Sequence, residues 1–243
     1  MIYTALTGMD AAMVRQRTIA SNLANAQTPG FRAETFAVQT LTLKGPALET
    51  RAQSQGSVRG ADMAGGKIVS TGQPLDIALS GEALLALQAT DGSEVYSRRG
   101  DLTVGAGGVL ENGDRLPVMG MAGPITVPPN RSITIASDGA IMSSDPAEPQ
   151  APAQEIGRIK LASAAGSRIE KDLDGFLRVV GGGVLPADPT AQLTTGMLEQ
   201  SNVDSAQVLV DMIEAQRSFD RRAKLFTTAG ELDQASARLM SLR

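Results

Sequence analysis

Two aspartates, Asp172 and Asp174, stand two positions apart and are followed at once by Gly175. Paired carboxylates can serve as the acid and base of a glycosidase, and closely spaced carboxylates also begin calcium-binding loops. A calcium loop would place a third oxygen ligand before its glycine, and this stretch does not. An Asp-Gly pair also suits a tight hairpin turn. We therefore expect turn residues here, and the carboxylate hydrolase is kept as a rival reading.

Two other kinds of segment could bind phosphate. The glycine runs 105–108 and 181–183 are not followed by a helix and a lysine, as a phosphate loop requires. A basic cluster is formed by Arg217, Arg221, Arg222 and Lys224, with Glu214 and Asp220 at spacings where helical side chains pair. A solvated helix face is the better interpretation of that cluster.

The composition excludes several classes of chemistry. The chain has no histidine, cysteine or tryptophan, which rules out Ser-His-Asp and Cys-His nucleophiles and thiolate metal sites. Its aromatic content of 3% argues against a stacking platform for nucleic acid. A net charge of −4 gives no field that would attract nucleic acid or anionic lipid. We expect no enzyme activity, no cofactor, no metal and no nucleic-acid partner.

The termini lack two common targeting signals. No stretch approaches the roughly 18 apolar residues that a membrane span needs, so no direct membrane insertion is expected. The first residues do not form a basic leader with an unbroken apolar run, because Thr4, Thr7, Gly8 and Asp10 interrupt it. If the protein leaves the cytoplasm, we expect it to do so without a cleaved signal peptide.

Residues 2–26 carry apolar side chains at steps of three and four, which predicts one face of an amphipathic helix. Polar residues, among them Thr18 and Asn22, are expected on the opposite face. Thr28, Pro29 and Gly30 end the pattern, because proline and glycine do not continue a helix. We assign 1–40 to this helical segment.

Residues 41–70 are rich in glycine, alanine, serine and glutamine, which is typical of an extended connector. From 71 to 190, short apolar runs alternate with Asp-Gly and Asn-Gly pairs, which favour tight hairpin turns. This pattern predicts a central antiparallel all-β domain. Within it, the proline-rich and acidic stretch 143–154 is expected to be a solvent loop.

The segment 191–243 is predicted to be a connector followed by a second, longer helix. Asp204 is a suitable N-cap, and Gln207 would complete a capping box. Nearly 40 residues at 1.5 Å each would form a rod of roughly 55–60 Å, longer than a compact domain of this size needs. The expected fold is α+β, with the long terminal helices pairing as a coiled-coil-like end domain beside the β domain.

The two apolar stripes are too broad for one intramolecular pair to cover, although such a pair is the simpler alternative. Packing against other subunits would bury the remainder. Gln16 and Gln216 could fix the register of that packing or be tolerated edge positions. Asn22, Asn25, Thr28 and Gly30 are expected to form the turn after the helix, with some interface contacts. We predict a subunit interface at Ile2, Leu6, Met9, Met13, Ile19, Leu23, Asn25, Leu209, Met212, Ile213, Gln216, Phe219, Phe226, Leu232 and Leu239.

Several motifs carry a family resemblance. Residues 20–32 (ASNLANAQTPGFR) closely resemble the N-terminal signature of flagellar rod and hook proteins, and 196–204 (GMLEQSNVD) with 212–219 (MIEAQRSF) resemble its C-terminal signature. Residues 71–81 and 96–100 resemble the central β region. One departure is the stretch Glu82-Ala83-Leu84-Leu85, where relatives usually show Gly-Phe-Phe. The length and residues 2–9 most resemble a proximal rod protein, with a distal rod protein second and a hook protein third.

The resemblance implies a structural subunit of the flagellar basal-body rod in the periplasm. The implied partners are copies of the chain itself, other proximal and distal rod proteins, and the flagellar type III export apparatus, through which the unfolded chain would pass. It further implies that the terminal helices form an inner tube, with the β domain outside, and that the rod transmits torque. A secreted β-rich adhesin with helical anchors is the rival from another class.

Overall fold

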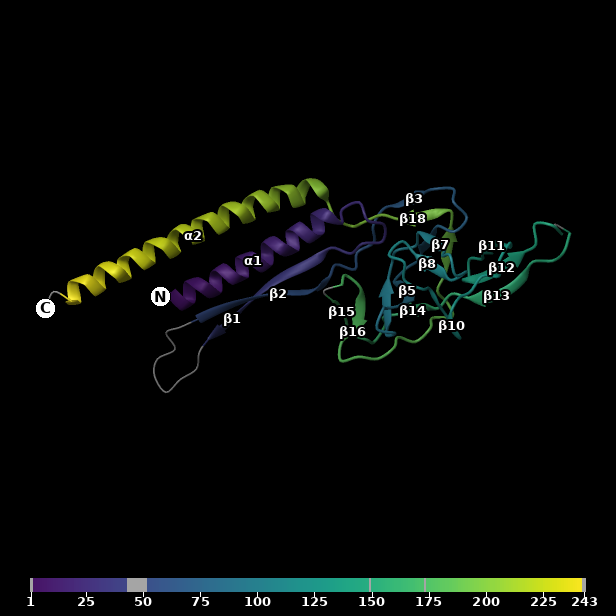
Figure 1. Ribbon diagram of the computed structural model, residues 1–243, viewed down its shortest axis with the longest axis horizontal. Coiled ribbons are helices and arrows are strands. Elements are labelled where there is room, and N and C mark those ends of the chain that lie inside the picture. Colours follow the sequence, from purple (N-terminus) through teal and green to yellow (C-terminus); the bar gives the residue numbers. More distant parts are fainter. Residues whose placement is uncertain (1, 43–51, 149, 173, 242–243) are drawn as a thin grey trace. The chain divides into compact units, whose positions relative to one another are not determined.

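The computed structural model describes residues 2–42, 52–148, 150–172 and 174–241 (Figure 1). The chain divides into two compact units. Unit 1 comprises residues 1–24, 34–60 and 203–243, and unit 2 comprises residues 25–33 and 61–202. Two helices and a β-rich central region with antiparallel pairing confirm the α+β class.

Unit 1 is built on two helices and a two-stranded sheet. The helices α1 (Ile2–Ala24) and α2 (Ser205–Ser241) lie side by side and run in opposite directions, purple and yellow in Figure 1. The strand β1 (Glu34–Thr42) pairs with β2 (Ala52–Ala61) and lies against α1. With 37 residues against 23, α2 is the longer helix, as the sequence predicted.

The start of α2 confirms the predicted N-cap but not the full capping box. Oδ1 of Asp204 accepts hydrogen bonds from the backbone N–H groups of Ala206 and Gln207, at 2.9 and 3.2 Å. The side chain of Gln207 points the other way, because its Nε2 donates to Oδ1 of Asp211 at 2.9 Å. One carboxylate therefore satisfies two of the free N–H groups at this end.

Strands occupy part of the stretch 41–70, where the sequence predicted a connector. They are the end of β1, all of β2 and β3 (Ile68–Ser70). The sequence of β2, AQSQGSVRGA, shows no alternation of apolar and polar residues. Alternation is the sequence signal for a strand with one buried face. A largely polar strand such as β2, which is held to β1 by backbone pairing, does not show this alternation and was therefore not predicted.

Unit 2 is a β domain in which the paired strands are antiparallel. Its largest sheet has the order β14-β5-β6-β16-β15, a second has the order β11-β12-β13, and the remaining strands form pairs. β12 carries a bulge between Ile141 and Met142. The strands are β4 (Ile77–Leu79), β5 (Ala83–Gln88), β6 (Glu94–Ser97), β7 (Leu102–Val104), β8 (Leu110–Asn112), β9 (Met119–Gly120), β10 (Gly123–Pro124), β11 (Ser132–Ile135), β12 (Ala140–Ser144), β13 (Gln154–Arg158), β14 (Leu161–Ser163), β15 (Ile169–Lys171), β16 (Leu177–Val179), β17 (Leu193–Thr195) and β18 (Met197–Glu199).

The strand β5 shows what the departure from the family pattern does. Leu84 and Leu85 are both fully buried, but they point to opposite faces of the sheet. Leu85 joins the main core cluster, while Leu84 joins a second cluster around Tyr96. Since both faces of this strand are covered, it is a continuous apolar run without alternation. Aliphatic side chains therefore fill the core at this point.

Most of the predicted turns and strands of unit 2 are found. Gly92, Gly139 and Gly175 have φ angles of 83°, 83° and 88°, as their Asp-Gly turns require. The Asn112-Gly113 pair also forms a turn, in which the Arg115 N–H donates to the Asn112 carbonyl at 2.8 Å, but its left-handed residue is Arg115, with φ of 61°, rather than Gly113. The run 125–127 forms only an isolated bridge rather than a strand, although its ends are buried.

Candidate subunit interface

The helix α1 buries a face different from the one that its apolar spacing predicts. Thr18 and Asn22, expected on the polar face, are only 3% and 8% exposed. Leu6 and Met13, from the apolar stripe, are 45% and 47% exposed. The cause is the returning chain: Asn22 Oδ1 accepts from the Glu34 N–H at 2.8 Å, and Asn22 Nδ2 donates to the Glu34 carbonyl at 3.0 Å. This pair of bonds orients the side chain of Asn22 toward the start of β1.

The apolar stripe of α2 is split between two faces. Ala215 is buried in unit 1, and Met212, Phe219 and Phe226 are half-buried along the same side of the helix. Each residue turns about 100° around a helix axis, so Leu209, Val210 and Ile213 project elsewhere. These three side chains are 50%, 51% and 53% exposed, and Leu225 is 69% exposed.

The predicted interface residues therefore fall into groups. The exposed ones are Leu6, Met13, Leu209, Ile213 and Gln216, whereas Ile19 is buried within the chain. The half-buried ones are Met9, Leu23, Asn25, Met212, Phe219 and Phe226. The side chains of Ile2, Leu232 and Leu239 lie outside the part that the structure describes. A single chain does not test contact with other subunits, so the interface stays a prediction.

The predicted interface left out two exposed apolar residues of α2, Val210 and Leu225, and the sequence prediction mistook the orientation of the neighbours of Val210. Leu209 and Val210 are adjacent, so both cannot lie on a narrow stripe that faces one partner. That adjacency was the available signal for a second apolar face. Gln16 is half-buried and Gln216 is exposed, and their role in register stays open.

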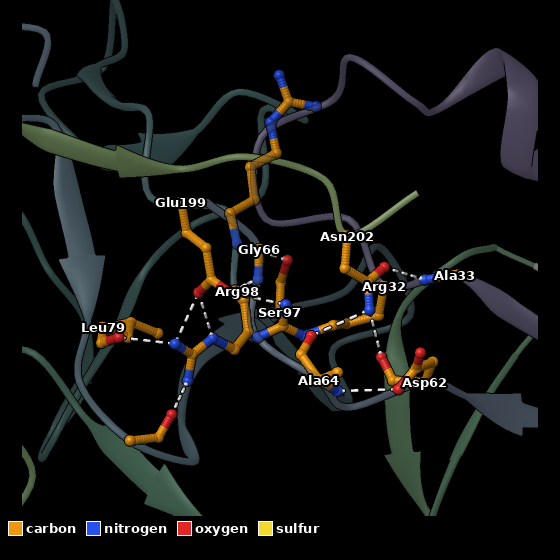
Figure 2. A network of polar contacts seen from close by, with 12 residues as sticks. Arg32, Ala33, Asp62, Ala64, Gly66, Leu79, Ser97, Arg98, Glu199 and Asn202 are labelled. Carbon is orange, nitrogen blue, oxygen red and sulfur yellow. Dashed lines mark hydrogen bonds and ion pairs between the residues drawn. The ribbon is translucent and has the colours of Figure 1, made fainter. Parts of the chain in front are cut away.

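The end of the N-terminal motif, 20–32, and the end of the motif 196–204 meet inside unit 2 (Figure 2). Asn202 Oδ1 accepts from the Ala33 N–H at 2.7 Å. Asn202 Nδ2 donates to the carbonyl groups of Asp62 and Ala64, at 2.8 and 3.0 Å. One amide side chain therefore ties three segments that are far apart in the sequence.

Glu199 is the centre of a buried ion triad, which we define as Arg32, Arg98 and Glu199. Arg32 Nη1 lies 2.7 Å from Glu199 Oε1, and Arg98 Nη2 lies 2.6 Å from Oε2, with all three side chains at most 5% exposed. The N–H of Gly66 also donates to Oε1, at 2.7 Å. Burial alone would raise the pKa of Glu199, but Arg98, the Gly66 N–H and Arg32 together lower that pKa below its ordinary value.

The guanidinium of Arg98, which binds Glu199, is also held by backbone carbonyl groups of the β domain. It donates to the carbonyl groups of Gly81 and Ala83 at 2.7 and 2.8 Å, and to that of Leu79 at 2.6 Å. Figure 2 shows the Arg98 side chain reaching Glu199 and Leu79. Such charge-assisted bonds are strong, and here they compensate for burying the charge.

Gly30 explains why the N-terminal motif contains a glycine. Its φ of 66° lies in the left-handed region, and a Cβ atom there would stand 2.3 Å from the backbone carbon of Arg98. Its N–H donates to the Glu199 carbonyl at 2.7 Å. Next to it, the Lys171 ammonium lies 3.4 Å from the centre of the Phe31 ring. The chain is therefore closely packed where the motifs meet.

Asp172 and Asp174 serve the turn between β15 and β16, as the sequence predicted. The Gly175 N–H donates to the Asp172 carbonyl at 3.0 Å. Arg178 donates to Oδ2 of Asp172 at 2.8 Å and lies 2.6 Å from Oδ2 of Asp174. Burial alone would raise the pKa of Asp174, yet its bonds with Arg178 lower that pKa. A carboxyl of this kind is ionised at neutral pH and does not serve as a general acid.

The other candidate sites are those for a metal ion, a membrane span and phosphate. Among the described residues, no group of three or more acidic, histidine or cysteine side chains is arranged to hold a metal ion. Within the same residues, neither helix combines the length and apolar character needed to span a membrane. The four basic residues of the α2 cluster are exposed, and Arg222 donates to the Gly8 carbonyl of α1.

Three family descriptions match separate parts of the chain. "Flagella basal body rod protein" matches residues 2–32, which cover α1 and the motif after it. "Flagellar hook protein FlgE/F/G D1 domain" matches residues 78–143 of the β domain. "Flagellar basal body rod FlgEFG protein C-terminal" matches residues 194–239, which include Glu199, Asn202 and most of α2.

Full-length relatives agree with these matches. The chain is 40% identical to the flagellar basal-body rod protein FlgF of Escherichia coli, over 99% of its own length and 98% of the relative's. The chain belongs to the flagellar basal-body rod protein family. FlgF of Salmonella typhimurium is 39% identical over the same shares, and FlgG of Agrobacterium fabrum is 30% identical over 94% of each chain. This rod family is structural rather than enzymatic, and the chain is more like these two FlgF proteins than like this FlgG.

Proposed function

We propose that this chain is a structural subunit of the proximal flagellar rod and that it polymerises through the helices of unit 1. The greater similarity to FlgF than to FlgG favours the proximal rod over the distal rod, which is the alternative. In the proposed rod, the subunit transmits torque and contacts copies of itself and other rod proteins. It reaches the periplasm unfolded, through the flagellar type III export apparatus and without a cleaved signal peptide.

The observation that carries the proposal is the outward apolar surface of unit 1. Leu6 and Met13 on α1, and Leu209, Val210 and Ile213 on α2, are about half exposed. Full burial of one such side chain contributes about 1.5–3 kcal/mol, so covering the exposed half of these five would add to the stability of an assembly. Neighbouring subunits that cover these residues would provide this stabilisation.

The proposal assigns different tasks to the parts of the chain. The end segments, 1–40 and 191–243, supply an axial core in which α1 and α2 extend their pairing into coiled-coil-like packing with other subunits. In this proposal the β domain, 71–190, takes no part in that core, and the hairpin β1-β2 belongs with α1 and α2 in unit 1. The sharp division of apolar exposure between the outer and inner faces of α1 and α2 supports this assignment.

A double substitution, Leu6→Glu with Met13→Glu, tests the proposal. It places two charges on the outer face of α1 without removing a buried side chain, so the chain should fold and be secreted. We expect no rods in purified basal bodies and no swimming in soft agar. The matched control is Met121→Glu in unit 2, a residue that is 64% exposed and lies in a turn. Normal rods in the double variant would refute assembly through α1.

The assignment to the proximal rod needs a separate measurement. Electron cryomicroscopy of basal bodies that carry an epitope-tagged chain should show the tag in the proximal part of the rod. A tag found only in the distal part would favour the FlgG-like alternative and leave the structural role intact.

A further inference from the structure

A small hollow lies in unit 1, between α1, α2 and β1. Its floor is formed by short and apolar side chains, including Ala11, Ala12, Phe36 and Ala215. It holds about 80 Å³. Pockets for drug-sized ligands hold about 300–1,000 Å³, so this hollow has room for one aliphatic side chain instead.

The rim of the hollow is positively charged. Arg15 of α1 and Arg222 of α2 are the charged residues among the described side chains that line it. Arg222 is fixed in place by its hydrogen bond to the Gly8 carbonyl. An occupant that suits this site presents an apolar side chain with a carboxylate beside it, because opposite charges favour contact and set its register.

The first turns of α2 have this combination. Leu209, Val210 and Ile213 are about half exposed, and they form what we call the α2 knob. The exposed Glu214 follows Ile213 directly. Between residues 204 and 216 the chain has three acidic residues and no basic one, whereas four of its residues between 217 and 224 are basic. The charge along α2 therefore divides into an acidic start and a basic middle.

The knob of one chain does not reach its own hollow. Ile213 and Ala215 belong to one continuous helix, and Ala215 is buried in the floor of the hollow while Ile213 projects outward. A rigid helix fixes that relation, so the knob needs a hollow on another molecule. A contact between two different surfaces of identical chains repeats without closing on itself, unless a rotation happens to close a ring, and it thus builds a helical filament.

We propose that the α2 knob of one copy docks into the arginine-rimmed hollow of the next copy, with Glu214 beside Arg15. This inference rests on the proposed rod function and names the partner of the same surface, a second copy of this chain. The contact is head-to-tail, since each copy docks its knob into one neighbour and receives the knob of the other neighbour in its hollow.

Disulfide trapping between two differently tagged copies tests the contact directly. The chain has no cysteine, so each engineered thiol is the one thiol of its copy. One copy carries Ile213→Cys and the other carries Ala12→Cys, and both are expressed in cells that lack the natural chain. Mild oxidation of basal bodies should give a dimer that carries both tags. The matched control replaces Ala12→Cys by Ala20→Cys, an exposed alanine on α1 that does not line the hollow.

The outcomes separate the inference from the proposed function. Swimming cells that give no mixed dimer, or as much dimer with Ala20→Cys as with Ala12→Cys, would overturn the docking contact while the rod role stands. Absence of the unmodified chain from purified basal bodies would overturn the rod role itself.

Charge reversal provides a second, independent measurement. Arg15→Glu should abolish the mixed dimer and swimming, and Glu214→Arg in the same chain should restore both, since the two charges then exchange places. Arg17→Glu, an exposed charge on α1 outside the hollow, is the control and should leave both unchanged. Failure of the double variant to recover, with the control unaffected, would show that Glu214 is not the partner of Arg15.

Discussion

The two units differ in how much of their apolar surface they cover for themselves. Unit 2 gathers its aliphatic side chains into two core clusters and buries the ion triad as well. Its most exposed apolar residues, such as Met121 and Val184, stand in turns and loops. Unit 1 instead leaves Leu6, Leu209 and Ile213 about half exposed along continuous helices. Unit 2 therefore covers most of its apolar surface within one chain, whereas unit 1 leaves apolar side chains along its helices that neighbouring subunits would cover in the proposed rod.

Deleting residues 205–243 should have the largest effect and should affect the two units differently. The deletion removes α2 but no residue of unit 2. We expect complete loss of rods and of swimming, while the thermal unfolding of the β domain, followed by circular dichroism, keeps its midpoint. Swimming after the deletion would contradict the assembly role. Loss of the β-domain transition would show that unit 2 is not self-sufficient.

Glu199→Gln should give the next largest effect, this time in unit 2. Breaking a buried ion pair leaves its partners charged without compensation, which costs about 3–5 kcal/mol. Urea unfolding should show this loss. The control is Arg158→Ala, since the side chains of its ion pair with Asp138 are 42% and 54% exposed and solvent-exposed pairs contribute little to stability. Equal losses in the free energy of unfolding for the two variants would show that the buried triad stabilises unit 2 no more than an exposed ion pair does.

The pH dependence of unit 2 should show a smaller effect of the same residue. The pKa of Glu199 lies below its ordinary value of 4.5 in the folded chain. As the pH falls, the unfolded chain therefore takes up its proton first, and the stabilisation is lost as the pH falls through the lowered pKa. Below pH 4.5 the natural chain should lose stability more steeply with acid than Glu199→Gln, and parallel profiles would contradict this.

Local rules predicted much of the fold. The α2 cap at Asp204 and the Asp-Gly turn at Gly175 depend on neighbours within a few residues, and both were found. The strand β2 was missed because its polar sequence has no alternation. The faces of α1 were partly misassigned because Asn22 is drawn inward by the backbone of Glu34, a contact that helical periodicity does not contain.

The ion triad was beyond the reach of sequence rules for a different reason. Arg32, Arg98 and Glu199 lie in three different stretches that resemble the flagellar family, 20–32, 96–100 and 196–204, and that shared property was a usable signal. No periodicity or spacing relates residues so far apart, and only the β-domain topology brings them together. The exposure of Leu209 and Val210 was closer to being predictable, because adjacent apolar residues cannot share one narrow stripe.

The hydrogen bonds of Asn202 have a consequence for how the molecule carries load. The backbone runs from one unit to the other between residues 24 and 25, 33 and 34, 60 and 61, and 202 and 203. Next to three of those crossings, Ala33 and Asn202 bond to each other and to Asp62. A force applied to unit 2 through these chain segments therefore acts first on this cluster of hydrogen bonds, which distributes it over the three segments before it reaches a sheet. In the proposed rod, these shared hydrogen bonds would resist the separation of one chain segment from the others.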